Sequence, residues 1–151
     1  MSSCQDALFD RPVGSSKKND RGSSIDQELE RSKRYIDNEM TLNEYQEATS
    51  YTAKYPNHGT GKADALAYVG LGLGETGEIQ NQIKKILRDD DGMLTEQRKA
   101  DILAEAGDVL WYLARLADEL ETPLSEIARN NIIKLEDRKA RGVIGGSGDH
   151  R

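Results

Sequence analysis

Apolar residues recur at every third or fourth position through most of the chain between residues 41 and 142. This spacing places them on one side of an α-helix, so it predicts helices joined by short loops. The four predicted helices span about 42–55, 63–88, 96–121 and 123–141. Residues 24–40 carry a sparser apolar stripe and predict a short accessory helix, whereas 1–23 and 143–151 show no period and predict a flexible arm and tail. The pattern therefore predicts an all-α domain over residues 41–142.

Residues that favour helix ends stand at the predicted boundaries. Thr41 with Glu44 has the pattern of a capping box, and Thr95 is placed to cap the third helix. Pro123 suits the first turn of the fourth helix, and Gly142 suits its end. These signals are independent of the apolar period and support the same bounds.

Two pairs of acidic residues stand at i, i+3 spacing. Glu75 and Glu78 belong to the second predicted helix, and Glu105 and Asp108 belong to the third. Each pair projects from one side of its helix, beside the apolar stripe. The stripes consist of Ile79, Ile83, Ile86 and Leu87 in the second helix and of Ile102, Ala106, Val109, Leu110, Leu113, Leu116, Ala117 and Leu120 in the third. If the two helices are antiparallel and their stripes pack together, the four carboxylates converge.

Four converging carboxylates require a cation. Two unit charges about 4 Å apart repel by roughly 4 kcal/mol at an effective dielectric constant of about 20. Oxygen ligands without a nearby Cys or His favour a hard divalent ion, Mg²⁺ or Mn²⁺. The alternative is that the acids form a solvated helix face, and the spacing alone leaves both interpretations open.

A glycine-rich segment overlaps the first acidic pair. The run Gly72-Leu73-Gly74-Glu75-Thr76-Gly77 fits the dinucleotide-binding pattern GxGxxG, which belongs in a strand-helix-strand unit. The chain shows no convincing second strand. The alternative is that the glycines lie within a helix, where each costs up to about 1 kcal/mol relative to Ala. Such a cost indicates close contact with another helix or with a ligand.

Composition narrows the classes of function. The net charge of −6 argues against a general nucleic-acid-binding surface, although a carboxylate cluster can hold a polyphosphate through bridging metal ions. Cys4 is the single cysteine, so no internal disulfide forms, as expected of a cytoplasmic protein. No apolar run approaches the length of a membrane span. We therefore expect neither a nucleic-acid nor a membrane partner.

The combined pattern resembles the MazG-type nucleoside triphosphate pyrophosphohydrolases, in particular compact single-domain phage members. The resemblance rests on Glu75-x-x-Glu78, twenty-six intervening residues, Glu105-x-x-Asp108, the run 109–113 and Asn131-x-x-Lys134-Leu135. It covers roughly residues 41–142. In one respect the chain departs from the pattern, because Gly74 stands where many members have Glu.

The resemblance implies a fold, a reaction and a set of site residues. The expected fold is a bundle of about four helices completed by a second subunit, as a homodimer or homotetramer. The expected reaction converts a nucleoside triphosphate, with dGTP or GTP favoured, to the monophosphate and pyrophosphate, in the host cytoplasm if the chain is phage-encoded. The four acids would bind Mg²⁺, with Mn²⁺ as a substitute, and Glu78 and Glu75 would act on the attacking water. The candidate substrate-binding residues are Asn131, Lys134, Arg138, Lys85 and His58.

Two other functions remain compatible with the same residues. A non-catalytic oligomerisation or adaptor module would carry the acids as a solvated face. A housecleaning hydrolase would keep the metal site but act on an alarmone or on damaged nucleotides.

Overall fold

The computed structural model describes residues 39–145 and the isolated positions 27, 30 and 33. Throughout these residues the regular structure is helical, without a strand, which confirms the predicted all-α class. The predicted arm lies outside the described residues, as do the predicted accessory helix apart from positions 27, 30, 33, 39 and 40 and the predicted C-terminal tail apart from residues 143–145. The described elements are α2 (Leu42–Thr49), the 3₁₀ turn η1 (Ser50–Thr52), α3 (Ala63–Gly72), the 3₁₀ turn η2 (Leu73–Glu75), α4 (Thr76–Asp89), α5 (Glu96–Glu119) and α6 (Leu124–Ala140).

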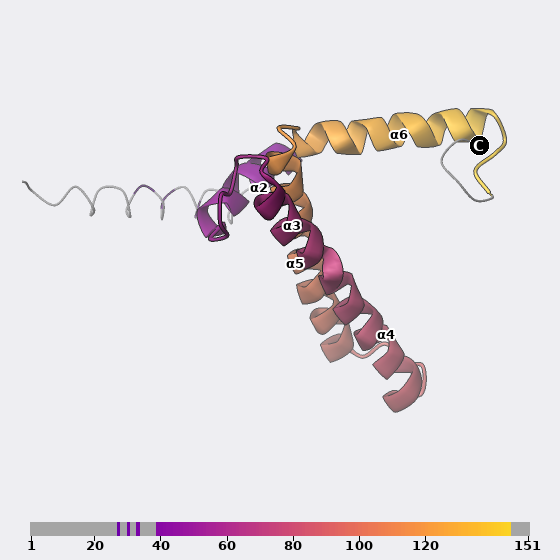
Figure 1. The fold of residues 1–151 in the computed structure, drawn as a ribbon. Helices are drawn as coiled ribbons and strands as arrows, with labels where there is room; N and C mark the ends of the chain where they lie inside the picture. Colours follow the sequence, from indigo (N-terminus) through magenta and orange to yellow (C-terminus); the bar gives the residue numbers. More distant parts are fainter. Residues whose placement is uncertain (1–26, 28–29, 31–32, 34–38, 146–151) are drawn as a thin grey trace, which may run out of the picture.

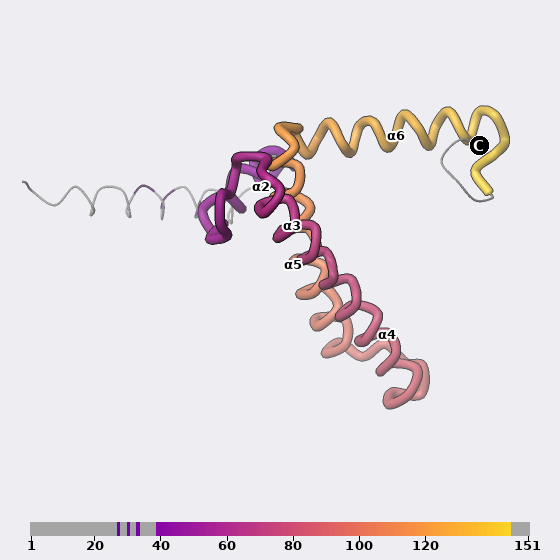
Figure 2. The backbone as a smooth tube through the Cα atoms, viewed as in Figure 1, coloured from indigo at the N-terminus to yellow at the C-terminus, as the bar shows by residue number. Residues whose placement is uncertain are grey.

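Helix α5 is the axis of the fold (Figure 1). α3, η2 and α4 follow one another without a gap and run antiparallel to α5 along its length (Figure 2). The turn between α4 and α5 uses Gly92 at φ +76°, and its N–H donates to the Ile86 carbonyl at 2.9 Å. α2 packs on the C-terminal part of α5, and α6 extends away from the α4–α5 pair (Figure 1). The antiparallel arrangement required for the four acids to converge is therefore present.

The helix ends agree with the local signals in the sequence. Thr41 and Glu44 form both hydrogen bonds of the capping box, and the Thr95 hydroxyl accepts a bond from the Arg98 N–H. Gly142 follows α6 at φ +68°, a left-handed conformation that glycine adopts without strain.

The hydrophobic core is small and is centred where α2 and α3 meet α5. Its fully buried members on α3 and α5 are Ala65, Val69, Ala114 and Ala117. Small side chains allow the helices to approach closely, and Trp111, Tyr112, Leu116 and Tyr45 cover the sides of this core. In a single chain such a core buries little apolar surface.

A buried arginine determines which face of α2 is inside. Arg115 is 1% exposed, and its guanidinium donates to the Thr49 hydroxyl and to Asp118, each at 2.9 Å, and to the Gln46 carbonyl. Buried charge requires such partners, so α2 presents its polar Gln46 and Thr49 to the interior. Tyr51 and Thr52, which follow α2, are exposed, and the prediction of a helix to residue 55 is wrong because η1 ends at Thr52.

The same network ties α2 to the start of α6. The Gln46 side chain accepts a hydrogen bond from the Leu124 N–H at 2.7 Å and donates to the Thr122 carbonyl at 3.1 Å. The Asn43 side chain accepts from the Ser125 N–H at 3.1 Å. Pro123, the residue before α6, provides no side-chain cap, so α2 satisfies these first N–H groups in its place.

The loop over residues 53–62 is anchored by a buried carboxylate. Glu119 is 3% exposed and accepts hydrogen bonds from the Tyr55 hydroxyl at 2.6 Å and from the N–H groups of Gly59, Thr60 and Gly61 at 2.7 to 3.0 Å. Burial by itself raises the pKa of Glu119, but these donors outweigh it and lower the pKa below its ordinary value. The ionised carboxylate therefore holds the loop against the end of α5.

The predicted apolar stripes are only partly buried within one chain. On α4, Leu87 is 73% exposed and Ile83 is also exposed, whereas Gln82 is buried and accepts a hydrogen bond from Arg98 at 3.1 Å. Leu113 on α5 and Leu120 directly after it are exposed too, so the two stripes pack together over only part of their length. Among the described residues, none of the helices has the length and apolar composition that crossing a membrane requires.

Candidate active site

The four acids lie where η2 and the start of α4 face the middle of α5. Glu75 ends η2, and Glu78 lies in the first turn of α4. Glu105 and Asp108 lie on α5. The prediction of one α-helix over 63–88 is wrong, because the 3₁₀ turn Leu73–Glu75 interrupts it and the first acidic pair spans the junction.

A close helix contact accompanies this interruption. A Cβ atom at Gly72 would lie 2.0 Å from the Tyr112 ring, so the ring packs directly on the backbone of α3. The glycine-rich run is thus helical rather than part of a dinucleotide-binding unit, and the predicted close contact is present at Gly72. It is absent at Gly70, Gly74 and Gly77, where a Cβ would meet nothing within 4 Å. Crowding therefore does not explain the glycine at position 74.

The acids influence one another electrostatically. Partial burial and the negative charges of Glu78, Asp108 and Glu75 raise the pKa of the Glu105 carboxyl, with a further contribution from Asp101. Such mutual repulsion requires that the side chains share one region, as the helix geometry predicts. In the part of the chain that the structure describes, neither Lys nor Arg forms an ion pair with these four acids.

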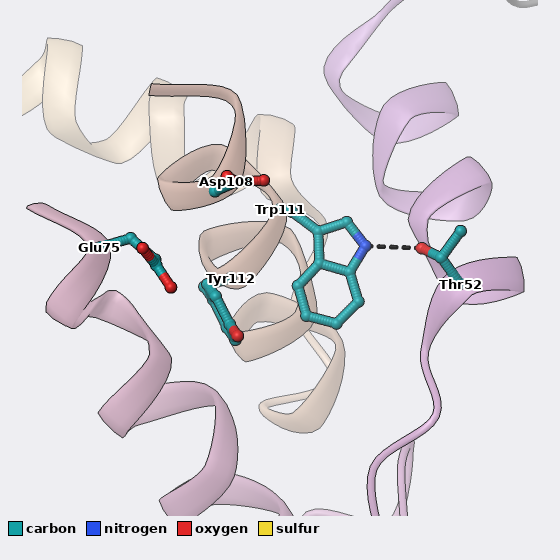
Figure 3. A pocket seen from close by; sticks show the side chains of 5 residues that line it. All are labelled: Thr52, Glu75, Asp108, Trp111 and Tyr112. Carbon is teal, nitrogen blue, oxygen red and sulfur yellow. Dashed lines mark hydrogen bonds between the residues drawn. The ribbon is translucent and has the colours of Figure 1, made fainter. Parts of the chain in front are cut away.

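The carboxylates are neighbours but do not form a closed cage. Among the described residues, no three acidic, His or Cys side chains are grouped tightly enough to hold a metal ion as they stand. Glu75 and Asp108 lie on opposite walls of a cleft (Figure 3). The donor set, consisting of carboxylate oxygens without a balancing cation, fits a hard divalent ion in its chemistry. The metal site itself stays a prediction.

The cleft between these walls has an aromatic side. It measures about 390 Å³ and is lined by Thr52, Glu75, Asp108, Trp111 and Tyr112. Figure 3 shows the Trp111 indole beside Tyr112, with its N–H directed at the Thr52 hydroxyl, to which it donates at 2.7 Å. Burial, Tyr68 and the charges of Glu75 and Asp108 raise the pKa of Tyr112 above its ordinary value.

The other candidate residues do not join the acids within one chain. Asn131 and Lys134 border a shallow pocket on α6, which runs away from the α4–α5 pair (Figure 1). Arg138, also on α6, is 6% exposed. Lys85 is half-buried on α4, and His58 is exposed in the loop with its ring edge toward Tyr55 at 5.9 Å between centroids. None of these placements tests a role in substrate binding.

Sequence reasoning missed two contributors to this region. Thr52 belongs to no sequence motif, and no local pattern pairs it with Trp111. Glu119 stood outside every motif, although its loop borders the aromatic cluster through Tyr55. Trp111 and Tyr112 belong to the run 109–113 of the sequence pattern, which by itself gives them no role. Their spacing of three and four residues from Asp108 was the signal that placed them beside the acids.

Comparison with known proteins identifies the family of the chain. Residues 65–143 match the MazG nucleotide pyrophosphohydrolase domain, and the match includes all four acids and α6. The chain is also similar to the Gene 37 protein of Mycobacterium phage L5, with 52% identity over 116 residues that cover 74% of this chain and 100% of the phage protein. No solved structure matches the chain. With more than half of its length in that domain, the chain belongs to the MazG nucleotide pyrophosphohydrolase family.

Proposed function

We propose that the protein hydrolyses a nucleoside triphosphate to the monophosphate and pyrophosphate, with Mg²⁺ bound by Glu75, Glu78, Glu105 and Asp108. The observation that supports this most is the raised pKa of Glu105, caused first by burial and then by the other three acids, beside a cleft with an aromatic wall. Membership of the family supports the reaction class. Mn²⁺ is expected to substitute, because it accepts the same oxygen ligands.

Glu78 and Glu75 act on the attacking water in this proposal. When bound, the metal ion supplies positive charge against the phosphates and lowers the pKa of a coordinated water. Glu78, exposed at the first turn of α4, orients the attacking water and accepts its proton. Glu75 faces the cleft opposite Asp108, where it assists in holding that water (Figure 3). The water attacks phosphorus, and the bond between the α- and β-phosphates breaks to release pyrophosphate.

A second copy of the chain is part of this proposal. Ile127, Ile132, Ile133 and Leu135 on α6 are all exposed, which is costly for side chains of this size. A homodimer or homotetramer would cover them. It would also give Asn131 and Lys134 of α6 a route to the acids of a neighbouring copy, a route that the extended α6 lacks within its own chain (Figure 1).

Guanine is proposed, as dGTP or GTP, only because the chain is similar to compact phage members of the family. The phage relative is compatible with action in the host cytoplasm. Action on a guanosine alarmone or a damaged nucleotide would use the same acids, so these compounds belong in the substrate screen.

Substitution of the acids tests the activity. Glu78→Gln and Asp108→Asn are expected to lower Mg²⁺-dependent pyrophosphate release by about 100-fold or more, because they remove the proposed base or a metal ligand. All common ribo- and deoxyribonucleoside triphosphates are screened, with pyrophosphate and orthophosphate measured separately.

Glu96→Gln is the matched control, because it makes the same charge change on α5 at a side chain that is 93% exposed. It should retain wild-type activity. Release of orthophosphate alone, or undiminished turnover in both acid variants, would refute the proposed reaction. An adaptor module would instead show no thermal shift with Mg²⁺ and triphosphate.

A further inference from the structure

Trp111 lies directly beside the acids because of its spacing on α5. It follows Asp108 by three residues, and Tyr112 follows by four, so all three side chains share one helix face about one turn apart. The cleft that they line with Thr52 and Glu75 measures about 390 Å³, within the range of small-molecule sites.

The indole is held in a fixed orientation. Its N–H donates to the Thr52 Oγ1 at 2.7 Å, and that hydroxyl donates in turn to the Thr49 carbonyl at 3.0 Å. The Thr52 hydroxyl therefore ties the indole to the end of α2 with its proton and one of its lone pairs. Because its proton is already used, Thr52 cannot donate a hydrogen bond to a ligand, and its main effect on a ligand is through the orientation of Trp111.

The face of the indole is not used by a parallel ring. Tyr112 meets it at an interplanar angle of 87° and Tyr55 at 84°, with centroids 5.0 and 6.3 Å away. Among the described residues, the rings that contact Trp111 meet it edge-on, and none is stacked on it. The side of the indole that borders the cleft can accept a flat ligand.

The chemistry of the cleft selects the kind of ligand. Two carboxylates on its walls repel a bare phosphate, whereas an uncharged heteroaromatic ring gains by stacking on an aromatic face. A ligand that carries both groups would place its ring on Trp111 and its phosphates, with their metal ions, along the acids. A nucleotide is such a ligand, because its base is an uncharged aromatic ring and its phosphates carry the negative charge.

We propose that Trp111 forms the stacking wall for the base of the nucleotide and that Thr52 is the residue that positions this wall. The inference rests on the proposed function and deepens it, because it locates the nucleoside part of the substrate. It also predicts that binding of the base is separable from the metal and from catalysis.

Trp111 is the single tryptophan of the chain, so its fluorescence reports the site directly. The full-length protein is titrated without metal with guanosine and deoxyguanosine, which carry the base without a phosphate for the acids to repel, and then with the other nucleosides. We expect saturable quenching of the emission. Tripolyphosphate with Mg²⁺, which has no base, should leave the emission unchanged.

Two variants separate positioning from stacking. Trp111→Leu is expected to raise KM by about 10- to 100-fold, the range of one lost base stack, with kcat much less affected. Thr52→Val keeps the side-chain shape but removes the hydroxyl, so it should raise KM by about threefold to tenfold and shift the tryptophan emission of the free protein. Thr52→Ser, which keeps the hydroxyl, should restore both values.

The outcomes distinguish this inference from the proposed function. Quenching by nucleosides without hydrolysis of any triphosphate would support the base site and refute the proposed reaction. Hydrolysis with unquenched emission and a wild-type KM in Trp111→Leu would support the reaction and overturn the base site. Emission that changes with protein concentration but not with nucleoside would also overturn it, because Trp111 would then be a subunit contact. If Trp111→Leu fails to fold, the titration of wild type and the Thr52 pair still decide.

Discussion

At the scale of single residues, Gly72 and Glu119 perform tasks that their neighbours in sequence do not reveal. Gly72 provides the flat backbone on which Tyr112 lies, and Tyr112 forms part of the cleft wall. Glu119 collects four hydrogen bonds and fixes the loop that contributes Tyr55 to the aromatic cluster. A side chain at position 72 would displace the Tyr112 ring, and a residue without a carboxylate at position 119 could not accept the four hydrogen bonds.

Replacing Gly72 tests the packing of Tyr112. Gly72→Ala should destabilise the protein by about 1–2 kcal/mol, because the cost of overpacking exceeds the gain in helix propensity. Gly70→Ala lies in the same helix with nothing within 4 Å of its new Cβ, so it should stabilise by up to about 1 kcal/mol. Urea unfolding measures both. Equal effects of the two substitutions would show that Tyr112 moves aside freely.

The anchoring role of Glu119 predicts a pH dependence of stability. Its pKa is lowered in the folded chain, so its contribution is complete above the ordinary value of 4.5 and is lost as the pH falls through the folded value. Glu119→Gln should lower the melting temperature at pH 7, and its difference from wild type should narrow below about pH 4.5. The exposed Glu121→Gln serves as the control. A difference that stays constant down to pH 3 would contradict this account.

At the scale of elements, α6 begins without a cap of its own. Gln46 and Asn43 of α2 satisfy the N–H groups of Leu124 and Ser125 from across the fold. The first of these bonds is buried and the second is exposed. The direction in which α6 leaves the fold therefore depends on α2 more than on the sequence of α6.

Removing these two side chains should give graded effects. Gln46→Ala leaves a buried N–H and the Thr122 carbonyl without their partner and is expected to cost about 2 kcal/mol. Asn43→Ala leaves the Ser125 N–H to bond with water and should cost about 0.5 kcal/mol. Denaturant unfolding followed by circular dichroism measures the difference. If Asn43→Ala were the more damaging, the buried bond would not be the anchor.

At the scale of the whole molecule, the described chain leaves large apolar side chains exposed on α4, α5 and α6. Ile133 on α6 is 60% exposed, and the buried core consists largely of alanines. Such an imbalance is typical of a subunit rather than of a complete globular unit. It is the reason that a second copy forms part of the proposed function.

Sedimentation equilibrium tests the assembly. The wild type should sediment as a dimer or tetramer, and Ile133→Glu should shift it toward monomer because a charge replaces an apolar contact. Activity should fall together with assembly, since Asn131 and Lys134 would lose the neighbouring acids. Arg129→Glu places the same new side chain on α6 at an exposed position that is already charged, and is the comparison. A wild type that is monomeric at micromolar concentration and fully active would remove the second copy from the mechanism.

The sequence by itself determined the helical class, most helix ends and the approach of the four acids. These properties depend on local rules, because caps, turn glycines and i, i+3 spacing act over a few residues. Thr41, Thr95 and Gly142 were therefore identified correctly, and Glu105 senses the charges of the other three acids.

Only the tertiary structure decided which faces are buried and what borders the acids. Arg115 turned the polar face of α2 inward, and Tyr112 packed on Gly72 where the second predicted helix is interrupted. The bond from Trp111 to Thr52 joins residues 59 positions apart. Periodicity gives the faces of a helix but not the partner that covers each face, because that choice depends on contacts between segments far apart in the chain.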